Sequence, residues 1–468
     1  MQETLSHYFG YKSFRPGQEE IITKILNHQH TLGVLPTGGG KSICYQVPGL
    51  MQGGTTIVIS PLISLMKDQV DQLQAMGIQA AYLNSSLTHK QQKEIEEQIK
   101  RGAIQFLYVA PERFENTFFL NLLRKIEIPL IAFDEAHCIS KWGHDFRPSY
   151  QSVIQKVFTL PQNFTIVALT ATATAEVQQD IMSKLSIGQN DVVKTSTKRR
   201  NLIFKVNPTY QRQKFVVDYV ANHEGQAGII YCSTRKQVEE LHEALNSEKI
   251  KSTIYHAGLT NKERIEAQND FLYDRVEVVI ATNAFGMGID KSNVRYVIHY
   301  NMPGDLESYY QEAGRAGRDG LKSECILLFS ERDKGLHEYF ITVSQADDDY
   351  KDKMGEKLTK MIQYTKTKKC LEATIVHYFE PNENLEECNQ CSNCIQENKT
   401  YDMTREAKMI ISCIARMKQQ ENYSVIIQVL RGEVTDYIKH HHYNELTTHG
   451  LMKNYTTSEL SHLDRKST

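Results

Sequence analysis

The chain has 468 residues, more than one hydrophobic core ordinarily organises, which predicts two to four domains. Lys and Arg (54) nearly balance Asp and Glu (56), so the formal net charge of -2 gives no overall attraction to nucleic acid, and such binding requires local clusters of cations. No run of about 18 apolar residues appears, and MQETLSHYFG lacks a basic region followed by an apolar stretch, so neither a membrane span nor a secretory signal is indicated. We therefore expect a cytoplasmic protein.

Apolar runs bounded by turn residues alternate with helical patterns of mixed charge. The runs are TTIVIS (55–60), IQFLYVA (104–110), PLIAFDE (129–135) and FTIVALT (164–170), then AGIIYCS (227–233), VEVVIAT (276–282), VRYVIHY (294–300) and SECILLF (323–329). Continuous apolar strands that alternate with helices are typical of βαβ units around a buried parallel sheet. The pattern predicts an α/β fold with two tandem domains, which meet near the polar, basic stretch TKRRNLIFKV.

A glycine-rich segment, LPTGGGKS (35–42), follows the short apolar strand TLGVL and precedes a helical pattern. Glycines let backbone N–H groups turn toward an anion, a lysine reaches the β and γ phosphates, and a serine ligates Mg²⁺. The strict P-loop pattern fails only at its first position, where Leu35 replaces glycine, and an ordinary flexible turn is the alternative. The predicted ATP-binding residues are Thr37, Gly38, Gly39, Gly40, Lys41 and Ser42.

A pair of carboxylates ends the run PLIAFDE, at the strand terminus where open α/β sheets bind ligands. We expect Asp134 to hold the metal and Glu135 to orient or deprotonate the attacking water; two exposed carboxylates at a turn are the alternative. The pair opens DEAHCISKWGHDFRP (134–148), which also carries the only tryptophan. A zinc site built from His137, Cys138 and His144 is the less favoured interpretation, because cysteines with metal-like spacing occur elsewhere.

Four of the nine cysteines are grouped, at Cys370, Cys388, Cys391 and Cys394, with the spacing C-x₁₇-C-x₂-C-x₂-C. In a reducing cytosol such a group indicates a metal site and not disulfides. Four thiolates at these intervals can close a tetrahedral Zn²⁺ site, which is usually structural. An iron–sulfur cluster uses the same ligands and remains the alternative.

Eight segments together, in order and in spacing, resemble the motif set of the RecQ family of superfamily 2 DNA helicases. They are FGYKSFRPGQEEII (9–22), LPTGGGKS, SPLISLMKDQ (60–69), DEAHCISKWGHDFRP, LTATAT (169–174), IIYCSTR (229–235), ATNAFGMGIDK (281–291) and YYQEAGRAGRDG (309–320). The resemblance covers residues 5 to 450 and implies two RecA-like lobes that close on ATP. It also implies movement 3′ to 5′ along single-stranded DNA.

The resemblance assigns roles residue by residue. It implies that Tyr11, Arg15 and Gln18 recognise adenine and that Gly288 and Asp290, with Gly286, contact nucleotide and DNA backbone. Arg315 and Arg318 match the motif that reaches the γ-phosphate across the cleft, and we favour Arg318 as the arginine finger.

The part of the motif after the carboxylates resembles the family's aromatic-rich loop, which senses single-stranded DNA. Its candidate DNA-binding residues are Trp142, His144, Phe146 and Arg147, with His137 as a polar link between hydrolysis and the strand. Aromatic rings and a guanidinium suit stacking on bases and contact with phosphate, whereas burial in the core is the alternative for the two aromatics.

The family has a zinc-binding module where the grouped cysteines lie, which favours Zn²⁺. We predict an ATP-binding RecA-like lobe at 1–204, a second RecA-like lobe at 205–340, a small helical zinc-binding domain at 341–400 and a partial winged helix at 401–468. The chain ends at Thr468, near where the last helix and wing would follow, so we expect a shortened winged helix with no further helical domain after it.

The predicted function is an ATP-dependent 3′–5′ DNA helicase, an enzyme of recombination, repair and replication. Its expected cofactors are ATP, Mg²⁺ and Zn²⁺. Its expected partners are single-stranded and 3′-tailed duplex DNA, single-strand-binding protein and other repair proteins, in a bacterial cytoplasm or nucleoid. The alternatives are a DNA-stimulated ATPase or nucleic-acid-remodelling protein without processive unwinding, and an RNA helicase.

Overall fold

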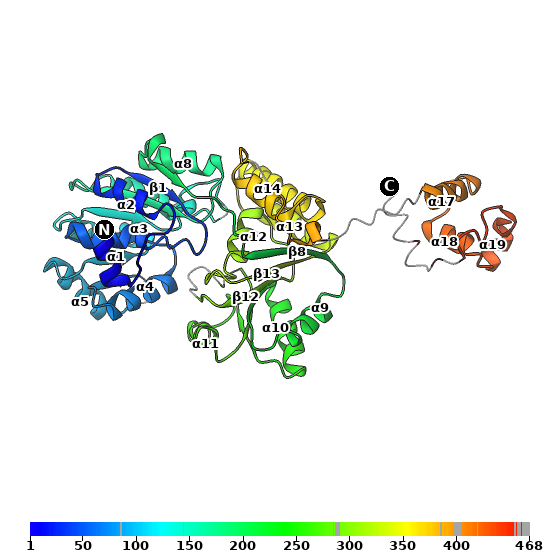
Figure 1. Ribbon diagram of the computed structural model, residues 1–468, viewed down its shortest axis with the longest axis horizontal. Coiled ribbons are helices and arrows are strands. Elements are labelled where there is room, and N and C mark those ends of the chain that lie inside the picture. The colour runs from blue at the N-terminus through cyan, green and yellow to red at the C-terminus, as the bar shows by residue number, and fades with distance from the viewer. Residues whose placement is uncertain are drawn as a thin grey trace. The chain divides into compact units, whose positions relative to one another are not determined.

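The computed structural model describes residues 1–84, 87–143, 145–283, 285, 291–383, 386–395, 404–418, 420–453, 455 and 460. The chain divides into two compact units, Met1–Gln396 and Glu397–Thr468 (Figure 1). Each unit is described by itself. No helix in the described part of the chain is long and apolar enough to cross a membrane.

The first lobe is built on a parallel sheet, whose strands follow the order β3-β4-β2-β5-β6-β1-β7 among the described residues. The strands are β1 (Thr31–Val34), β2 (Thr56–Ile59), β3 (Ala80–Leu83), β4 (Phe106–Val109), β5 (Leu130–Phe133), β6 (Thr165–Thr170) and β7 (Val192–Lys194). The helices are α1 (Gln2–Phe9), α2 (Gln18–Leu26), α3 (Ile43–Gln52), α4 (Ile63–Ala75), α5 (His89–Lys100), α6 (Thr117–Leu123), α7 (Pro148–Val157) and α8 (Ala175–Leu185). Strands β1, β2, β4, β5 and β6 are buried along their whole length, which explains their continuous apolar sequences.

The second lobe repeats this design, with a parallel sheet in the order β10-β11-β9-β12-β13-β8 over the residues described. Its strands are β8 (Leu202–Pro208), β9 (Ala227–Tyr231), β10 (Ser252–Tyr255), β11 (Val278–Ala281), β12 (Val294–His299) and β13 (Ser323–Phe329). Its helices are α9 (Arg212–Ala221), α10 (Arg235–Ser247), α11 (Asn261–Leu272) and α12 (Leu306–Ala313). The two parallel sheets confirm the predicted tandem α/β fold.

The edge strand β8 runs through the stretch that the sequence indicated as the lobe boundary. It pairs with β13 along its whole length, so the second sheet begins at Leu202 and the predicted limit at 204/205 falls inside β8. As an edge strand, β8 alternates buried with half-buried residues only over its first half and is half-buried or exposed beyond it. The basic run TKRRN directly before it gave the region the composition of a linker.

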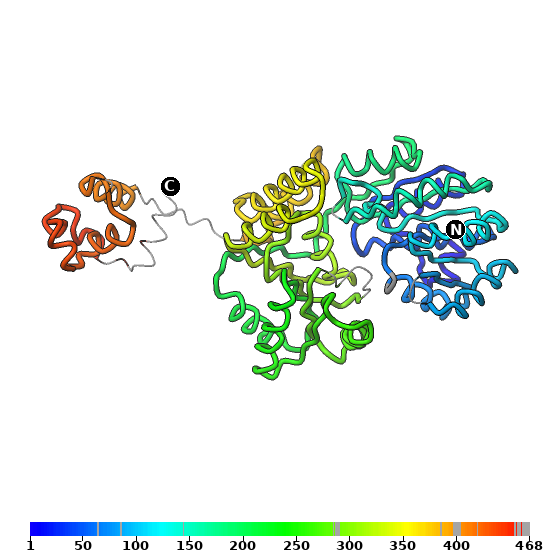
Figure 2. The backbone as a smooth tube through the Cα atoms, turned by 180° about the vertical axis from the view of Figure 1, so that it is seen from behind, coloured from blue at the N-terminus to red at the C-terminus, as the bar shows by residue number. Residues whose placement is uncertain are grey.

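Beyond the second sheet the first unit continues in helices. They are α13 (Glu331–Val343), α14 (Asp348–Lys366), α15 (Leu371–Phe379) and α16 (Ser392–Ile395). Leu358, Met361, Leu371 and Ile375 of this helical module belong to the same buried cluster as residues of the second sheet. Both views show α13 and α14 beside α12 (Figure 1, Figure 2). The module therefore shares its core with the second lobe.

In the described part of the second unit the chain forms the helices α17 (Thr404–Arg416), α18 (Tyr423–Arg431) and α19 (Asp436–His440). They pack around a separate small core that includes Ile410, Cys413, Leu430 and Ile438.

Candidate nucleotide-binding site and aromatic loop

The glycine-rich segment forms a tight loop between β1 and α3. Gly38 (φ 81°) and Gly40 (φ 72°) adopt left-handed backbone conformations that favour glycine. A Cβ on Gly40 would lie 2.5 Å from Nε2 of Gln18, so a larger residue there would displace the Gln18 amide. The N–H of Gly39 donates to the carbonyl of Pro36 (2.8 Å). The segment thus has the strand, turn and helix arrangement that a phosphate loop needs.

Two of the three candidate adenine-binding residues contact this loop directly. The buried Gln18 donates to the carbonyls of Gly39 (3.2 Å) and Gly40 (2.9 Å), and accepts from the backbone N–H of Arg15 (2.8 Å). The guanidinium of Arg15 donates to the carbonyl of Gly38. Tyr11 remains 53% exposed, so its ring has a face available for stacking.

A cavity of about 400 Å³ brings the predicted residues of both lobes together. Its lining includes Tyr11, Arg15, Gln18, Thr37, Gly38, Gly40, Lys41, Ser42, Asp134 and Glu135 from the first lobe, and Ser292, Gln311, Arg315 and Arg318 from the second. Gly39 lies in the same loop, whereas Gly286, Gly288 and Asp290 lie outside the described residues. The volume is within the range of small-ligand and cofactor sites.

The two carboxylates follow β5 directly. The N–H of Asp134 donates to the carbonyl of Ile59 (2.9 Å), and the N–H of Glu135 donates to Oδ1 of Asp134 (3.0 Å). Glu135 adopts φ 48°, a left-handed conformation that is unusual for a residue with a side chain. Burial, and then the charge of Glu135, raise the pKa of Asp134 to about 7, although Lys41 opposes this. A cation between the two carboxylates would relieve this unfavourable charge.

The raised pKa of Asp134 predicts how stability depends on pH when nucleotide and divalent metal are absent. Between the ordinary carboxyl value and about 7 the native state binds more protons than the unfolded state, so stability falls as pH rises through this range. Each unit by which the pKa rises on folding corresponds to about 1.4 kcal/mol. We expect the melting temperature in EDTA to drop less between pH 5 and pH 8 in Asp134→Asn than in the wild type. The exposed control Asp71→Asn should keep the wild-type slope, and an equal slope in all three proteins would contradict the prediction.

His137, on the short 3₁₀ turn Ala136–Ile139, lies inside the first lobe. Its ring is 1% exposed, with Nδ1 3.3 Å from Oε2 of Glu135 and 3.1 Å from Oγ1 of Thr170. The Thr170 hydroxyl donates to the carbonyl of Thr172 (3.1 Å), within the segment LTATAT. His137 therefore offers almost no surface to a DNA strand here, and its contacts join Glu135 to a neighbouring motif.

A second group of metal-ligand types lies close by. One ligand atom each from His137, Cys138 and Asp145 fall within 4.8 Å of one another, whereas His144 of the alternative zinc site lies outside the described residues. The Asp145 carboxylate is already paired with Arg147 at 3.0 Å. The carboxylate's charge is thus compensated without a metal.

The aromatic loop follows this turn and leads into α7. Trp142 is half-buried against the core of the first lobe, and Phe146 is also half-buried. The ammonium groups of Lys141 and Lys353 lie 5.5 and 5.9 Å from the centroid of the Trp142 ring. Arg147 donates to the carbonyl of Pro61 (2.9 Å), in the segment SPLISLMKDQ. Both aromatic side chains thus combine partial packing with an exposed part.

The two arginines of YYQEAGRAGRDG differ in their surroundings. Arg315 is buried and hydrogen-bonds the hydroxyl of Tyr231 at the end of β9. A Cβ on Gly38 would lie 3.5 Å from Cγ of Arg318, so Arg318 lies against the phosphate loop. The assignment of Arg318 as the finger stays a prediction.

Sequence reasoning missed Arg199, which lies in the stretch between the lobes. Its guanidinium donates to the carbonyl of Thr37 in the phosphate loop (2.6 Å) and to those of Gly314 (3.4 Å), Ala316 (3.1 Å) and Gly317 (2.9 Å) in the second lobe. The basic run TKRRN was visible in the sequence, but the chain gives no local signal for which arginine reaches four distant carbonyls.

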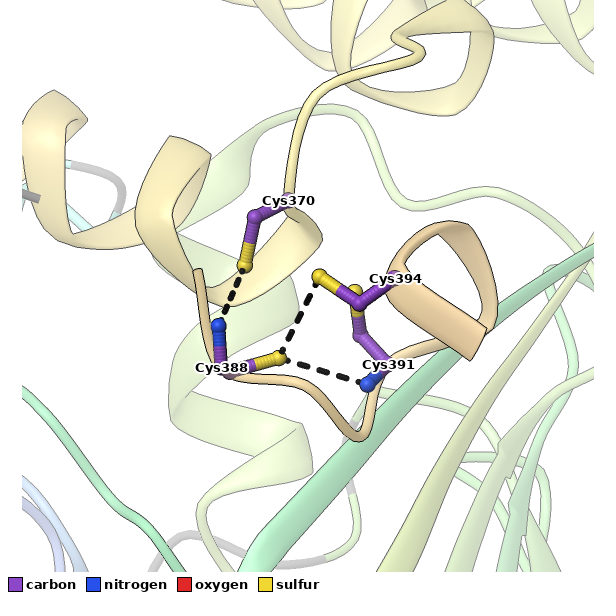
Figure 3. Close-up of side chains that lie close together, drawn as sticks. All are labelled: Cys370, Cys388, Cys391 and Cys394. Atoms are coloured by element: carbon purple, nitrogen blue, oxygen red, sulfur yellow. Dashed lines mark hydrogen bonds between the residues drawn. The ribbon is translucent and has the colours of Figure 1, made fainter. Parts of the chain in front are cut away.

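The four grouped cysteines come together at the start of α15 and around α16, and Figure 3 shows their side chains turned toward one another. One sulfur from each lies within 4.8 Å of the others, and none is in a disulfide. Backbone N–H groups of Leu371, Ala373, Cys388 and Cys391 donate to sulfurs of the cluster at 3.2 to 3.5 Å. Such donors stabilise thiolates, so the arrangement fits a closed tetrahedral Zn²⁺ site.

Comparisons with known proteins agree with this geometry. Residues 15–181 match the DEAD/DEAH box helicase family, 211–320 the helicase conserved C-terminal domain, 331–395 the RecQ zinc-binding domain and 397–467 the RQC domain. Among solved structures, Mycobacterium smegmatis helicase Lhr bound to ssDNA and AMP-PNP aligns with a TM-score of 0.58 at 16% identity, over 78% of this chain and 57% of that one. S. cerevisiae Dbp5 bound to RNA and ADP BeF3 aligns with a TM-score of 0.59 at 19% identity, over 76% of this chain and 97% of that one. These two likenesses establish the two-lobed fold alone.

Sequence relatives give the family. ATP-dependent DNA helicase RecQ of Bacillus subtilis is 46% identical over 461 residues, which cover 98% of this chain and 78% of the relative. The protein of the same name from Pasteurella multocida is 40% identical over 452 residues, which cover 96% of this chain and 71% of the relative. Both names specify DNA, so the RNA helicase alternative is not favoured. The chain therefore belongs to the RecQ family of superfamily 2 and is an ATP-dependent DNA helicase.

Proposed function

We propose that this helicase moves 3′ to 5′ along single-stranded DNA and separates the duplex ahead of it, in recombination, repair and replication. The observation that carries the proposal is the cavity in which Lys41, the carboxylates after β5 and Arg318 meet. Because hydrolysis needs groups from both lobes, the lobes close and reopen in each cycle of ATP hydrolysis. This opening and closing is the motion that stepping along a strand requires. The polarity follows from the motif set that the chain shares with its family.

The residues around the cavity have distinct proposed roles. Ser42 and Asp134 would hold the Mg²⁺ that accompanies ATP, because hard oxygen ligands suit this ion and the pKa of Asp134 is raised where a cation would relieve it. The bound ion would supply charge neutralisation at the β and γ phosphates. Lys41 binds those phosphates, Glu135 orients and deprotonates the attacking water, and Arg318 stabilises the charge of the transition state.

The remaining nucleotide contacts come from the loop and the first helices. Arg15 and Gln18 bind the edge of adenine and Tyr11 stacks on its face, next to the loop carbonyls that the first two already contact. Thr37, Gly38, Gly39 and Gly40 cradle the phosphates, and Arg315 supports Arg318. Gly288 and Asp290 remain sequence-based candidates for coupling nucleotide to DNA.

We also propose that the aromatic loop binds the DNA strand through Trp142, His144, Phe146 and Arg147, and that His137 relays its state to Glu135. Two solved helicases with the same fold, Lhr and MrfA, are bound to DNA in their structures, which supports a strand site on these lobes. Contacts of this kind hold a strand without reading its sequence.

Replacing either aromatic tests the loop. Trp142→Ala and Phe146→Ala are expected to retain nucleotide binding and lose about 1–3 kcal/mol of strand binding, with loss of most DNA-stimulated hydrolysis. Phosphate release with and without an oligothymidylate measures the effect, and Phe118→Ala, an 83% exposed aromatic in the same lobe, is the matched control. Full stimulation in the loop variants would contradict the assignment.

Strand separation tests the whole proposal. The chain should unwind a 3′-tailed duplex with ATP and leave a 5′-tailed duplex intact. DNA-stimulated hydrolysis without unwinding of either substrate would support the alternative of a remodelling ATPase. Stimulation by RNA equal to that by DNA would reopen the RNA alternative.

Three further expectations belong to the proposal. Single-strand-binding protein and other repair proteins are its proposed partners, and the bacterial cytoplasm or nucleoid its proposed location, since both follow from a DNA substrate. The four-domain division stays a proposal as well, with the second lobe extended to begin at β8.

A further inference from the structure

Helix α14 of the zinc-binding module reaches back to the aromatic loop of the first lobe. Its N-cap residue Asp347 pairs with Lys141 (2.8 Å), and its Lys353 pairs with Glu176 at the start of α8 (2.8 Å). The ammonium groups of Lys141 and Lys353 also lie over the ring of Trp142. The proposed DNA-sensing side chain is thus held by a helix from a different module.

One lysine of α14 lies deeper than these surface pairs. Lys357 is 5% exposed, and its ammonium donates to the carbonyl of Trp142 (2.8 Å) and pairs with the buried carboxylate of Glu307 (3.0 Å). A buried ammonium is costly unless such partners compensate its charge, so the positions of loop and carboxylate depend on each other.

Glu307 connects this contact to the nucleotide site. It stands in the first turn of α12, and the same helix ends at Ala313, immediately before the segment that carries Arg315 and Arg318. Gln311 of α12 and both arginines line the nucleotide cavity. The eight residues of α12 form one continuous helix, so we expect a shift of its backbone at Glu307 to reach its far end.

We propose that Lys357 is a positioning residue that couples the aromatic loop to the arginines after α12. When a DNA strand draws the loop outward, the Trp142 carbonyl leaves Lys357, and the ammonium and Glu307 must rearrange together. That rearrangement moves α12, and Arg318 with it, relative to the phosphate loop. The inference rests on the proposed function of the loop and of Arg318, and adds the residue that joins them.

The chain offers a built-in reporter, because Trp142 is its only tryptophan. The indole lies beside two ammonium groups, so its emission responds when the loop leaves α14. Coupling between sites is reciprocal. In the wild type we therefore expect Trp142 emission to change on binding an oligothymidylate, and also on binding AMP-PNP with no DNA present.

The test compares Lys357→Met with the full-length wild type. Methionine fills the space of the lysine stem without the charge. We expect the rate of ATP hydrolysis without DNA to stay within about twofold of the wild type, and its stimulation by DNA to fall about tenfold, a loss typical of allosteric coupling. The change in Trp142 emission on AMP-PNP should disappear, whereas the change on DNA should persist. A merely structural role would not separate those two optical signals.

The controls keep the outcome decisive. Lys334→Met removes an exposed lysine that pairs with Glu338 of the same helix, α13, and should behave as wild type. If Lys357→Met leaves Glu307 buried without compensation and fails to fold, the double variant Lys357→Met/Glu307→Gln removes both charges and carries the same test. If Lys357→Met or the double variant shows the DNA stimulation and the AMP-PNP response of the wild type, this inference is wrong, although the proposed function would stand. A wild type with no DNA stimulation would instead overturn the proposed function.

Discussion

Glu135→Gln is expected to lower ATP hydrolysis by roughly 10³-fold, the range of a lost general base, while nucleotide binding persists. The amide keeps the shape of the carboxylate in its left-handed backbone position but cannot accept a proton from water. It also keeps hydrogen-bonding capacity toward His137, so the tie to Thr170 is preserved. Steady-state phosphate release with single-stranded DNA gives the rate, and titration with a fluorescent ATP analogue gives the affinity.

A matched variant separates chemistry from general damage. Glu112→Gln makes the same change at an exposed residue of the same lobe, outside the cavity, and should hydrolyse ATP at the wild-type rate. Hydrolysis within tenfold of the wild type in Glu135→Gln would show that another group activates the water. Lost nucleotide binding in that variant would instead assign Glu135 to binding.

Cys391→Ser is expected to release the metal and lower the melting temperature by roughly 10 °C or more. Cys391 is fully buried and its sulfur accepts the N–H of Leu371 (3.3 Å) at the start of α15. The module's helices share a buried cluster with the second sheet, so their loss exposes that core. The module also supports the stretch between the lobes, because Glu380 accepts the N–H of Thr197 (2.8 Å).

Metal analysis and a thermal scan check this prediction together. The wild type should contain about one zinc per chain and Cys391→Ser almost none. Cys413→Ser replaces a buried cysteine of the second unit, outside the cluster, and should retain the zinc. Iron in place of zinc in the wild type would favour the iron–sulfur alternative, and an unchanged metal content in Cys391→Ser would exclude this cysteine as a ligand.

The central strands were predictable because burial on both faces demands continuous apolar sequence, as in FTIVALT and SECILLF. The apolar runs of the sequence include none of the edge strands. Strands β7, β8 and β10 are partly exposed and mix polar with apolar residues, so they resemble loops, whereas β3 is a short run of four residues, AAYL. The phosphate loop, the carboxylate pair and the cysteine cluster were found because their ligands lie close in sequence and their chemistry restricts spacing.

Residues that act across long distances escaped prediction. Arg199 and Lys357 each donate to main-chain carbonyls of segments far along the chain, and any residue type supplies a carbonyl. A sequence therefore carries no pattern for the acceptor, and an isolated basic residue on a mixed-charge segment is usually solvated. Only the folded arrangement identifies such donors.

The four carbonyls around Arg199 have an uneven distribution that bears on how the lobes part. Three belong to the loop after α12 and one to Thr37 of the phosphate loop. Separation of the lobes breaks the hydrogen bond to Thr37 and leaves those to the loop after α12 and to Asn201, so we expect Arg199 to move with the second lobe. Apart from Oδ1 of Asn201 (3.3 Å), these acceptors are main-chain carbonyls, so the side chains of Thr37 and Ala316 take no direct part in holding the guanidinium.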